Sequence, residues 1–115
     1  MDDFTNLINQ LGSLEGRIKN SIKEAVKINA LEAEQKAKLL CPVDTGHLRR
    51  SISTEINETT DKILVDVLTN VEYGSYVEYG TSRQPAQPFM KPAYESQKVQ
   101  FERDISETVR RELGR

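Results

Sequence analysis

Hydrophobic residues recur along this chain with two different periods, and the change of period constrains the fold more than any other feature. From residue 3 to residue 41 they return every three or four positions, as on an amphipathic helix. Between residues 52 and 67 they alternate with polar residues, as on a strand. From residue 94 the helical period returns. The sequence therefore predicts an α+β fold with a small sheet between two helical segments.

The first helical segment is expected to consist of two helices. Phe4, Leu7, Ile8 and Leu11 mark a short helical segment over residues 1–13, which Gly12-Ser13 interrupts. A long helix is expected over residues 14–41. Its apolar face is formed by Ile18, Ile22, Ala25, Val26, Ala33, Ala37 and Leu40. Pro42 ends this helix, because proline disfavours the α conformation in the residue before it.

The middle of the chain is expected to contain a sheet. Asp44 is placed to cap a short helical turn that ends near Leu48. Two alternating runs, residues 52–56 and 63–67, then predict a β-hairpin with one apolar face. A third strand is expected at Ser75–Tyr79, between two glycines. We therefore expect a small antiparallel sheet of about three strands within residues 51–80.

The last third of the chain combines a proline-rich loop with a helix. Residues 81–92 hold three of the four prolines, so they cannot form a central strand or helix. They are expected to form an exposed loop that becomes ordered only in an assembly. The C-terminal helix is expected over residues 92–113, with Pro92 in its first turn. Its apolar stripe consists of Tyr94, Phe101, Ile105, Val109 and Leu113.

Composition limits the class of protein. The 115 residues fit a single domain, residues 1–115, with little room for a second. The net charge is −2 and both signs are evenly spread, so nucleic acid is not an expected partner. No apolar run approaches a membrane span and the N-terminus is acidic, so no membrane or signal peptide is expected. Cys41 is the only cysteine, which fits a reducing cytoplasm during synthesis.

The sequence predicts neither catalysis nor a cofactor or metal site. His47 is the only histidine, and it lies close to Asp44 without a nucleophile motif. Glu72 and Glu78 could form an acid/base pair, but they fit better as charged ends of an edge strand. Cys41 closes an apolar stretch and fits a packed side chain better than a nucleophile. The expected protein is not an enzyme.

Tyrosines are concentrated in one short stretch. Tyr73, Tyr76 and Tyr79 lie within seven residues, and Phe89 follows. On a strand, Tyr73 and Tyr79 would share one face while Tyr76 points to the other. Tyrosine combines a large apolar ring with a polar tip, which suits a protein interface. The alternative, that these rings cap a thin core, remains open at this point.

Two stretches of the chain resemble the two signatures of a phage tail-component family. One is Cys41-Pro-Val-Asp-Thr-Gly-His-Leu-Arg-Arg-Ser-Ile52, and the other is Tyr76-Val-Glu-Tyr-Gly-Thr-Ser-Arg-Gln-Pro-Ala-Gln-Pro-Phe-Met-Lys-Pro-Ala93. They are similar to the signatures of the gene product ten family of HK-type lambdoid siphophages. The positions that match are Pro42, Asp44, Thr45, Gly46, Leu48, Arg49, Ser51, Ile52, Tyr76, Glu78, Gly80, Thr81, Pro85, Pro88, Phe89 and Pro92.

The resemblance implies a structural protein of a phage or prophage, placed in the virion tail or at the head-to-tail junction. Such a protein would complete the tail or join it to the head as a homo-oligomeric ring, possibly a hexamer, in contact with other neck or tail proteins. An adaptor or assembly chaperone that is absent from the particle is the alternative. The family brings no catalytic residue to carry over.

Two expectations about sites follow from the signatures. The protein interface is expected to consist of Tyr76, Tyr79, Arg83, Gln84, Pro85, Gln87, Pro88 and Phe89. Phe89 is expected to be the exposed anchor of this loop. Glu78 is expected to form an ion pair with Arg49, or with Arg50, because a charge among apolar neighbours needs a partner.

Overall fold

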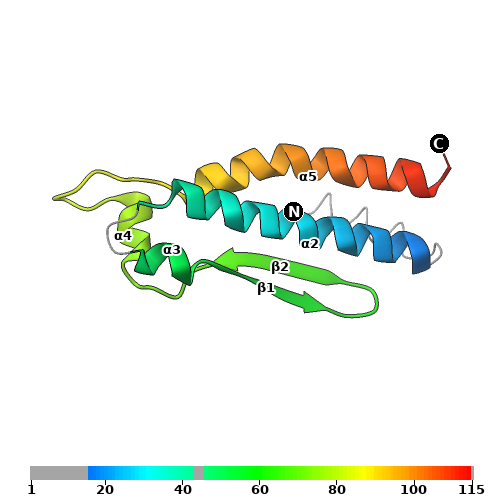
Figure 1. The fold of residues 1–115 in the computed structure, drawn as a ribbon, viewed down its shortest axis with the longest axis horizontal. Helices are drawn as coiled ribbons and strands as arrows, with labels where there is room; N and C mark the ends of the chain where they lie inside the picture. Colours follow the sequence, from blue (N-terminus) through cyan, green and yellow to red (C-terminus); the bar gives the residue numbers. More distant parts are fainter. Residues whose placement is uncertain (1–15, 43–45, 115) are drawn as a thin grey trace.

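The computed structural model describes residues 16–42 and 46–114, and the predicted short helical segment at residues 1–13 lies outside them. Six elements follow in order: α2 (Gly16–Leu40), α3 (His47–Ser51), β1 (Ser53–Glu58), β2 (Ile63–Leu68), α4 (Gly74–Tyr79) and α5 (Met90–Glu112). The molecule is elongated, with extents of 54 × 24 × 22 Å. We call α2, α5 and the hairpin the shaft, and we call α3, α4 and residues 81–89 the tip (Figure 1).

The helices α2 and α5 lie side by side and run in opposite directions (Figure 1). Ser21 near the start of α2 donates a hydrogen bond from Oγ to Oε1 of Glu112 at the end of α5, over 2.9 Å. Midway along the pair, Gln97 Nε2 donates to Asn29 Oδ1 over 2.6 Å, and both side chains are buried. Sliding one helix along the other would leave these two amides unpaired in the interior. They therefore fix the register of the helix pair.

The hairpin confirms the predicted alternation. β1 and β2 pair in antiparallel fashion, with Thr54 opposite Val67 and Ile56 opposite Val65. All four side chains lie on the face of the hairpin that is turned toward α2, because side chains at alternate positions of a strand share a face. Leu64 lies on the other face and is exposed. The hairpin lies along α2 (Figure 1), and Ile63 and Val65 of β2 also pack in the cluster that contains Ile105 of α5.

Polar contacts hold β1 to α2. Thr54 Oγ1 donates a hydrogen bond to Glu34 Oε1 over 2.8 Å. The Glu58 carboxylate lies 2.9 Å from Lys27 Nζ and 3.5 Å from Lys23 Nζ. The hydrogen bond from Lys27 lowers the pKa of Glu58, and partial desolvation opposes it. The same contact raises the pKa of Lys27.

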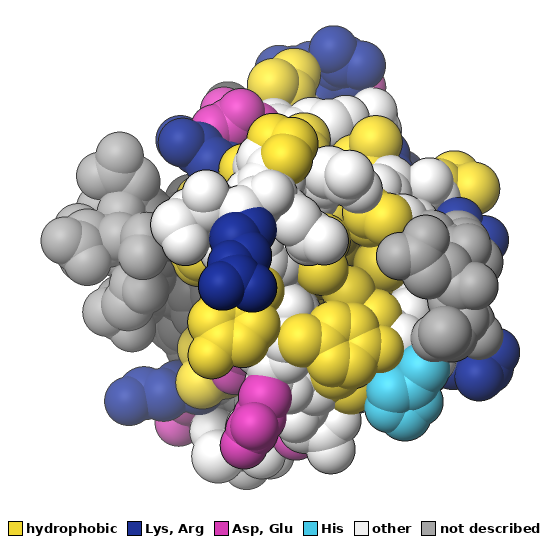
Figure 2. Space-filling model, turned by 90° about the vertical axis from the view of Figure 1, so that its left-hand side faces the viewer, with side chains coloured by type: hydrophobic (Ala, Val, Ile, Leu, Met, Phe, Trp, Pro, Cys, Tyr) yellow, Lys and Arg dark blue, Asp and Glu magenta, His cyan; other side chains and the backbone are white. Residues whose placement is uncertain are grey.

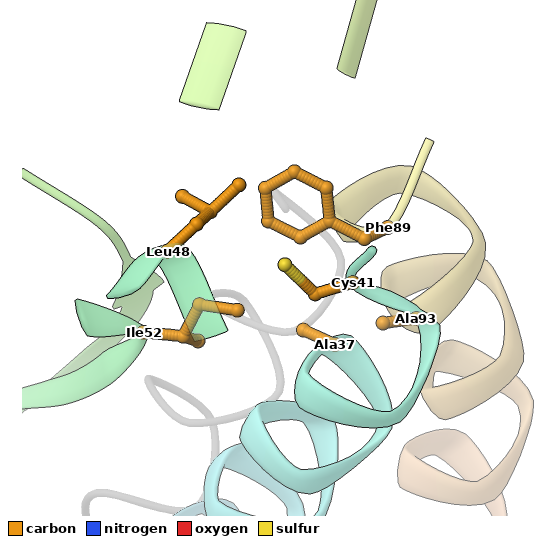
Figure 3. Close-up of a cluster of buried hydrophobic side chains, with 6 residues drawn as sticks. All are labelled: Ala37, Cys41, Leu48, Ile52, Phe89 and Ala93. Atoms are coloured by element: carbon orange, nitrogen blue, oxygen red, sulfur yellow. The ribbon is translucent and has the colours of Figure 1, made fainter. Parts of the chain in front are cut away.

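Two hydrophobic clusters form the interior. The cluster in the shaft consists of Ile18, Ile22, Val26 and Ile105, with Ile63, Val65, Phe101 and Val109 packed against it. The cluster next to the tip consists of Ala37, Cys41, Leu48, Ile52, Phe89 and Ala93 (Figure 3). Cys41 is confirmed as a packed side chain, and its burial raises the pKa of its thiol, which Arg49 opposes. The second cluster joins the end of α2 to α3 and to the start of α5.

The structure confirms the α+β class and the predicted helices with small shifts of their ends. The first long helix ends at Leu40, two residues before Pro42, and α5 begins at Met90 with Pro92 in its first turn. The sheet has two strands among the described residues, so the prediction of a third strand at Ser75–Tyr79 is wrong. That segment forms α4 instead.

The burial pattern explains why α4 is a helix. Gly74, Val77 and Glu78 face inward, and the steps of three and one between them fit a helix rather than a strand. Gly80 N donates to Tyr76 O over 2.8 Å, and Gly80 then ends the helix with a φ of 80°. A Cβ at Gly80 would lie 2.7 Å from Ala86 N, so only glycine fits this turn without strain.

Candidate interaction surface

Tyr76 and Tyr79 of α4, and Tyr73 just before it, lie on the outer side of this short helix. Tyr76 is 62% exposed and Tyr79 is 80% exposed, while Tyr73 is partly covered. The Tyr73 ring lies 6.3 Å from the ring of His47, measured between centroids. A helix brings residues at every third position to one side, whereas the predicted strand would have turned Tyr76 away from the other two. We call Tyr73, Tyr76 and Tyr79 the tyrosine patch.

The tyrosine patch lies at one end of the long molecule, beside the exposed loop. Residues 81–88 are all exposed. Figure 2 views this end face and shows hydrophobic side chains near its middle. Large apolar rings at the end of a narrow molecule are unusual on a surface that meets only water, and they mark interaction sites. The exposure of Tyr76 and Tyr79 does not fit the core-cap alternative, and their role in a protein interface stays a prediction.

The loop between α4 and α5 is held by hydrogen bonds at both ends. Thr81 N donates to Gln84 O over 2.9 Å, and Thr81 Oγ1 accepts from Arg83 N over 3.2 Å and from Gln84 N over 3.1 Å. Near its other end, Gln87 N donates to Val77 O over 2.8 Å. The exposed part of the expected interface is formed by Arg83, Gln84, Pro85, Gln87 and Pro88. The mobility of this loop in a free monomer stays a prediction.

Phe89 does not belong to the exposed loop. Its side chain is 1% exposed and packs between Leu48, Cys41 and Ala93 (Figure 3). The expectation that Phe89 is the free anchor of the loop is therefore wrong. The density of prolines correctly predicts a loop, but it does not predict where each side chain points. Phe89 is the last residue before α5, and its ring turns into the interior. The ring fixes the end of the loop against the end of α2.

Glu78 caps the first turn of α5. Its side chain is 8% exposed, and Oε1 accepts hydrogen bonds from Phe89 N over 3.0 Å and from Met90 N over 2.9 Å. Oε2 accepts from Lys91 N over 3.1 Å. The first N–H groups of a helix have no partner within the helix, and they attract negative charge. One buried carboxylate thus binds the start of α5 to α4.

The predicted ion pair of Glu78 with Arg49 or Arg50 is wrong. Both carboxylate oxygens of Glu78 are bonded to backbone N–H groups, and no ion pair within residues 16–42 and 46–114 joins Glu78 to an arginine. Arg49 instead donates from Nη2 to Cys41 O over 3.3 Å. The charge on Glu78 does find a partner, as expected, but that partner is a helix N-terminus rather than a side chain.

The remaining signature residues shape the connection between α2 and α3. Gly46 has a φ of 75° at the start of α3, and a Cβ there would lie 2.6 Å from Arg50 Nη1. Pro42 is half-buried after the end of α2. Asp44, predicted to cap this turn, lies outside the described residues. Gly46 therefore sets the backbone direction just before Leu48 and Arg49.

No group of three or more histidine, cysteine, aspartate or glutamate side chains that could hold a metal ion occurs among the described residues. A polar cluster links α2 to α5: buried Asn29 donates to Asp104 Oδ2 over 3.0 Å and accepts from buried Gln97. Nor is any described helix both long enough and apolar enough to cross a membrane.

A comparison with known families assigns the chain. Residues 5–80, more than half of the chain, match the family described as "Bacteriophage HK97-gp10, putative tail-component". The match includes the first signature and α4, while most of the proline loop and α5 lie beyond its end. The chain matches no curated protein and no solved structure at a significant level. The chain therefore belongs to the HK97 gp10-like family of phage tail components.

Proposed function

We propose that this protein completes the phage tail or joins the tail to the head, as a homo-oligomeric ring whose tips dock on a neighbouring neck or tail protein. The observation that carries the proposal is the tyrosine patch beside a loop that is bonded at both ends. A structural role in a phage tail, and hence a place in the virion, follows from the family. The ring and the joining step are our proposal.

The structure of the tip supports docking with only a small loss of conformational entropy. Proline at two positions of the exposed loop restricts the backbone before any partner binds. The bonds of Thr81 and Gln87 restrict it further. Because a restricted loop loses little conformational entropy on binding, more of the contact energy appears as affinity. Tyrosine adds large contact area with few rotatable bonds.

A complementation assay tests this proposal. A phage that lacks the gene is supplied with the wild-type protein or with the double variant Tyr76→Ser and Tyr79→Ser. Truncation of a buried interface ring commonly costs about 2 kcal/mol or more, so we expect free heads and tails to accumulate. The melting temperature of the variant should equal that of the wild type, because both rings are exposed.

The matched control is Val99→Ser, which removes an exposed apolar side chain on the outer side of α5, in the shaft. It should leave joining normal. Mass spectrometry of purified particles should find the wild-type protein in every preparation. Normal joining with the double tyrosine variant would refute the docking role of the tip. Absence of the protein from particles would favour the adaptor or chaperone alternative.

A further inference from the structure

Both outer edges of the hairpin are unpaired within the described residues. Thr59 N donates to Lys62 O over 2.9 Å next to the turn, and hydrogen-bonded and non-bonded pairs alternate from there along an antiparallel ladder. The backbone groups that point away from the partner strand are therefore those of Thr54, Ile56 and Glu58 on β1 and of Ile63, Val65 and Val67 on β2. Each edge offers three N–H groups and three C=O groups to another strand.

The free edge of β2 opens on an apolar groove. β2 and α5 both pack on α2, and a groove of about 470 Å³ lies between them. Its lining includes Val26 and Ala30 of α2, Val65 of β2, and Tyr94 and Phe101 of α5. An unpaired strand edge beside an apolar groove is the arrangement that binds an added strand, since the backbone provides bonds and the groove receives side chains. A solitary chain would be expected to protect such an edge.

We propose that β1 of a second copy adds to the free edge of β2, so that the hairpins of successive copies form one continuous antiparallel sheet. This contact rests on the proposed function, because it is the contact that would build the ring. The two edges match in length, since β1 and β2 each have six residues. They also match in hydrogen bonding, since each points three alternate residues outward.

Strand parity decides which side chains enter the groove. Pairing the outward-pointing residues of β1 with those of β2 places Thr54, Ile56 and Glu58 of the second copy on the same sheet face as Val65, and Glu58 is already paired with Lys27 and Lys23 of its own α2. That face is turned toward α2 and the groove. Ile56 is 42% exposed in the single chain, although it belongs to the face that packs inward. A slip by one residue would instead present Glu55 and Asn57 to an apolar groove, so the apolar lining selects the first arrangement.

If the binding partner is a second copy of this chain, one type of contact pairs both free edges of the hairpin. Joining the β1 edge of one copy to the β2 edge of the next is a heterologous contact, which closes into a ring when the rotation between copies allows it. Every edge is then paired, as in a closed barrel. A symmetric pairing of two β2 edges would stop at two copies and would leave each β1 edge open.

Charge variants on one strand test this contact. Ile56→Lys places a charge at the groove, whereas Asn57→Lys adds the same charge on the opposite face of the same strand. Sedimentation of the full chain should show self-association weakened by roughly tenfold or more for Ile56→Lys. Asn57→Lys should associate like the wild type. Equal association of both variants with the wild type would overturn the proposal.

Disulfide trapping provides a second measurement that does not depend on variant stability. Chains with Ile56→Cys are mixed with chains that carry cysteine at Ile63, Val65 or Val67, and are oxidised both free and in purified tails. One of the three mixtures should give a crosslinked pair, while the same mixtures with Asn57→Cys should not. Cys41 is buried, so it can be left in place.

The two proposals fail in different ways. If no mixture crosslinks, or if the Asn57→Cys chains crosslink equally, the hairpin contact is wrong. The tail-joining role still stands in that case, provided that the protein is found in particles and the double tyrosine variant blocks joining. If the protein is absent from particles, the role itself is refuted.

Discussion

In the shaft many similar contacts share the stabilisation, whereas at the tip a few single residues hold the backbone. Helix α2 buries Ile18, Ile22 and Val26 at steps of four, and each contributes the same kind of packing. At the tip, Glu78 alone accepts three backbone N–H groups, and Phe89 provides the one aromatic ring of the cluster between α3 and α5. Regular packing should therefore tolerate substitution better than the tip does.

The largest expected effect is that of Phe89→Ala. Removing a ring from the cluster next to the tip leaves a cavity, and such changes typically cost about 3–5 kcal/mol of unfolding free energy. Phe89→Leu refills part of the space and should cost much less. Urea unfolding followed by circular dichroism measures both. If Phe89→Ala unfolds like the wild type, the ring is not part of the core and the distinction between tip and shaft fails.

Next in size is Glu78→Ala. The substitution leaves three N–H groups at the start of α5 without their acceptor, one of them in a buried and two in partly buried hydrogen bonds, so a loss of about 3 kcal/mol is expected. Glu72→Ala removes an exposed carboxylate six residues earlier and serves as the control. Hydrogen exchange should show faster exchange at Met90 and Lys91 in the first variant only. Equal stability of the two variants would contradict the capping role.

The positions of Phe89 and Glu78 mark the limit of what the sequence alone could predict. The long helices and the hairpin were predicted with small end shifts, because periodicity records which face is buried. The interpretation of α4 was wrong because its inward positions, Gly74, Val77 and Glu78, include a glycine and a charge, which do not register as apolar. Of these three positions, only Val77 has the apolar side chain by which an inward-facing position is recognised in a sequence.

The candidate site was predicted in part for a related reason. Composition predicted an exposed proline loop and left open whether Tyr76 and Tyr79 are exposed or cap the core, and the structure exposes them at one end of the molecule. The partner of Glu78 is a set of backbone groups more than ten residues away, and no pattern of side chains encodes such a bond. Tyr73 was assigned to a strand face, although its spacing of three from Tyr76 and Tyr79 was a helical signal.

A smaller effect is expected for Gly80→Ala. With a φ of 80° and a would-be Cβ 2.7 Å from a backbone nitrogen, the position should lose about 2 kcal/mol when a side chain is added. Gly16→Ala is the matched control in the shaft, because a Cβ there meets nothing within 4 Å. As a helix residue, alanine should stabilise that position slightly. Thermal unfolding should therefore shift in opposite directions, and a shift in the same direction would contradict the difference between the two regions.

The smallest effect on stability is expected from loss of the ion pair between Glu58 and Lys27, which lies on the surface of the shaft. The hydrogen bond from Lys27 holds the pKa of Glu58 below its ordinary value of 4.5, so the unfolded chain binds a proton more readily than the folded one. The contribution to stability is complete above that ordinary value, and it is lost as the pH falls through the lower folded value. Molar salt should also weaken it, because both groups are reached by solvent.

Glu58→Gln tests this interpretation against Glu55→Gln, whose carboxylate lies on the opposite face of β1 and forms no ion pair with a described residue. Unfolding free energies are measured by urea titration between neutral pH and about pH 3. The loss of stability on acidification should be smaller for Glu58→Gln than for the wild type and unchanged for Glu55→Gln. If both variants follow the wild-type curve, the ion pair adds nothing measurable to stability.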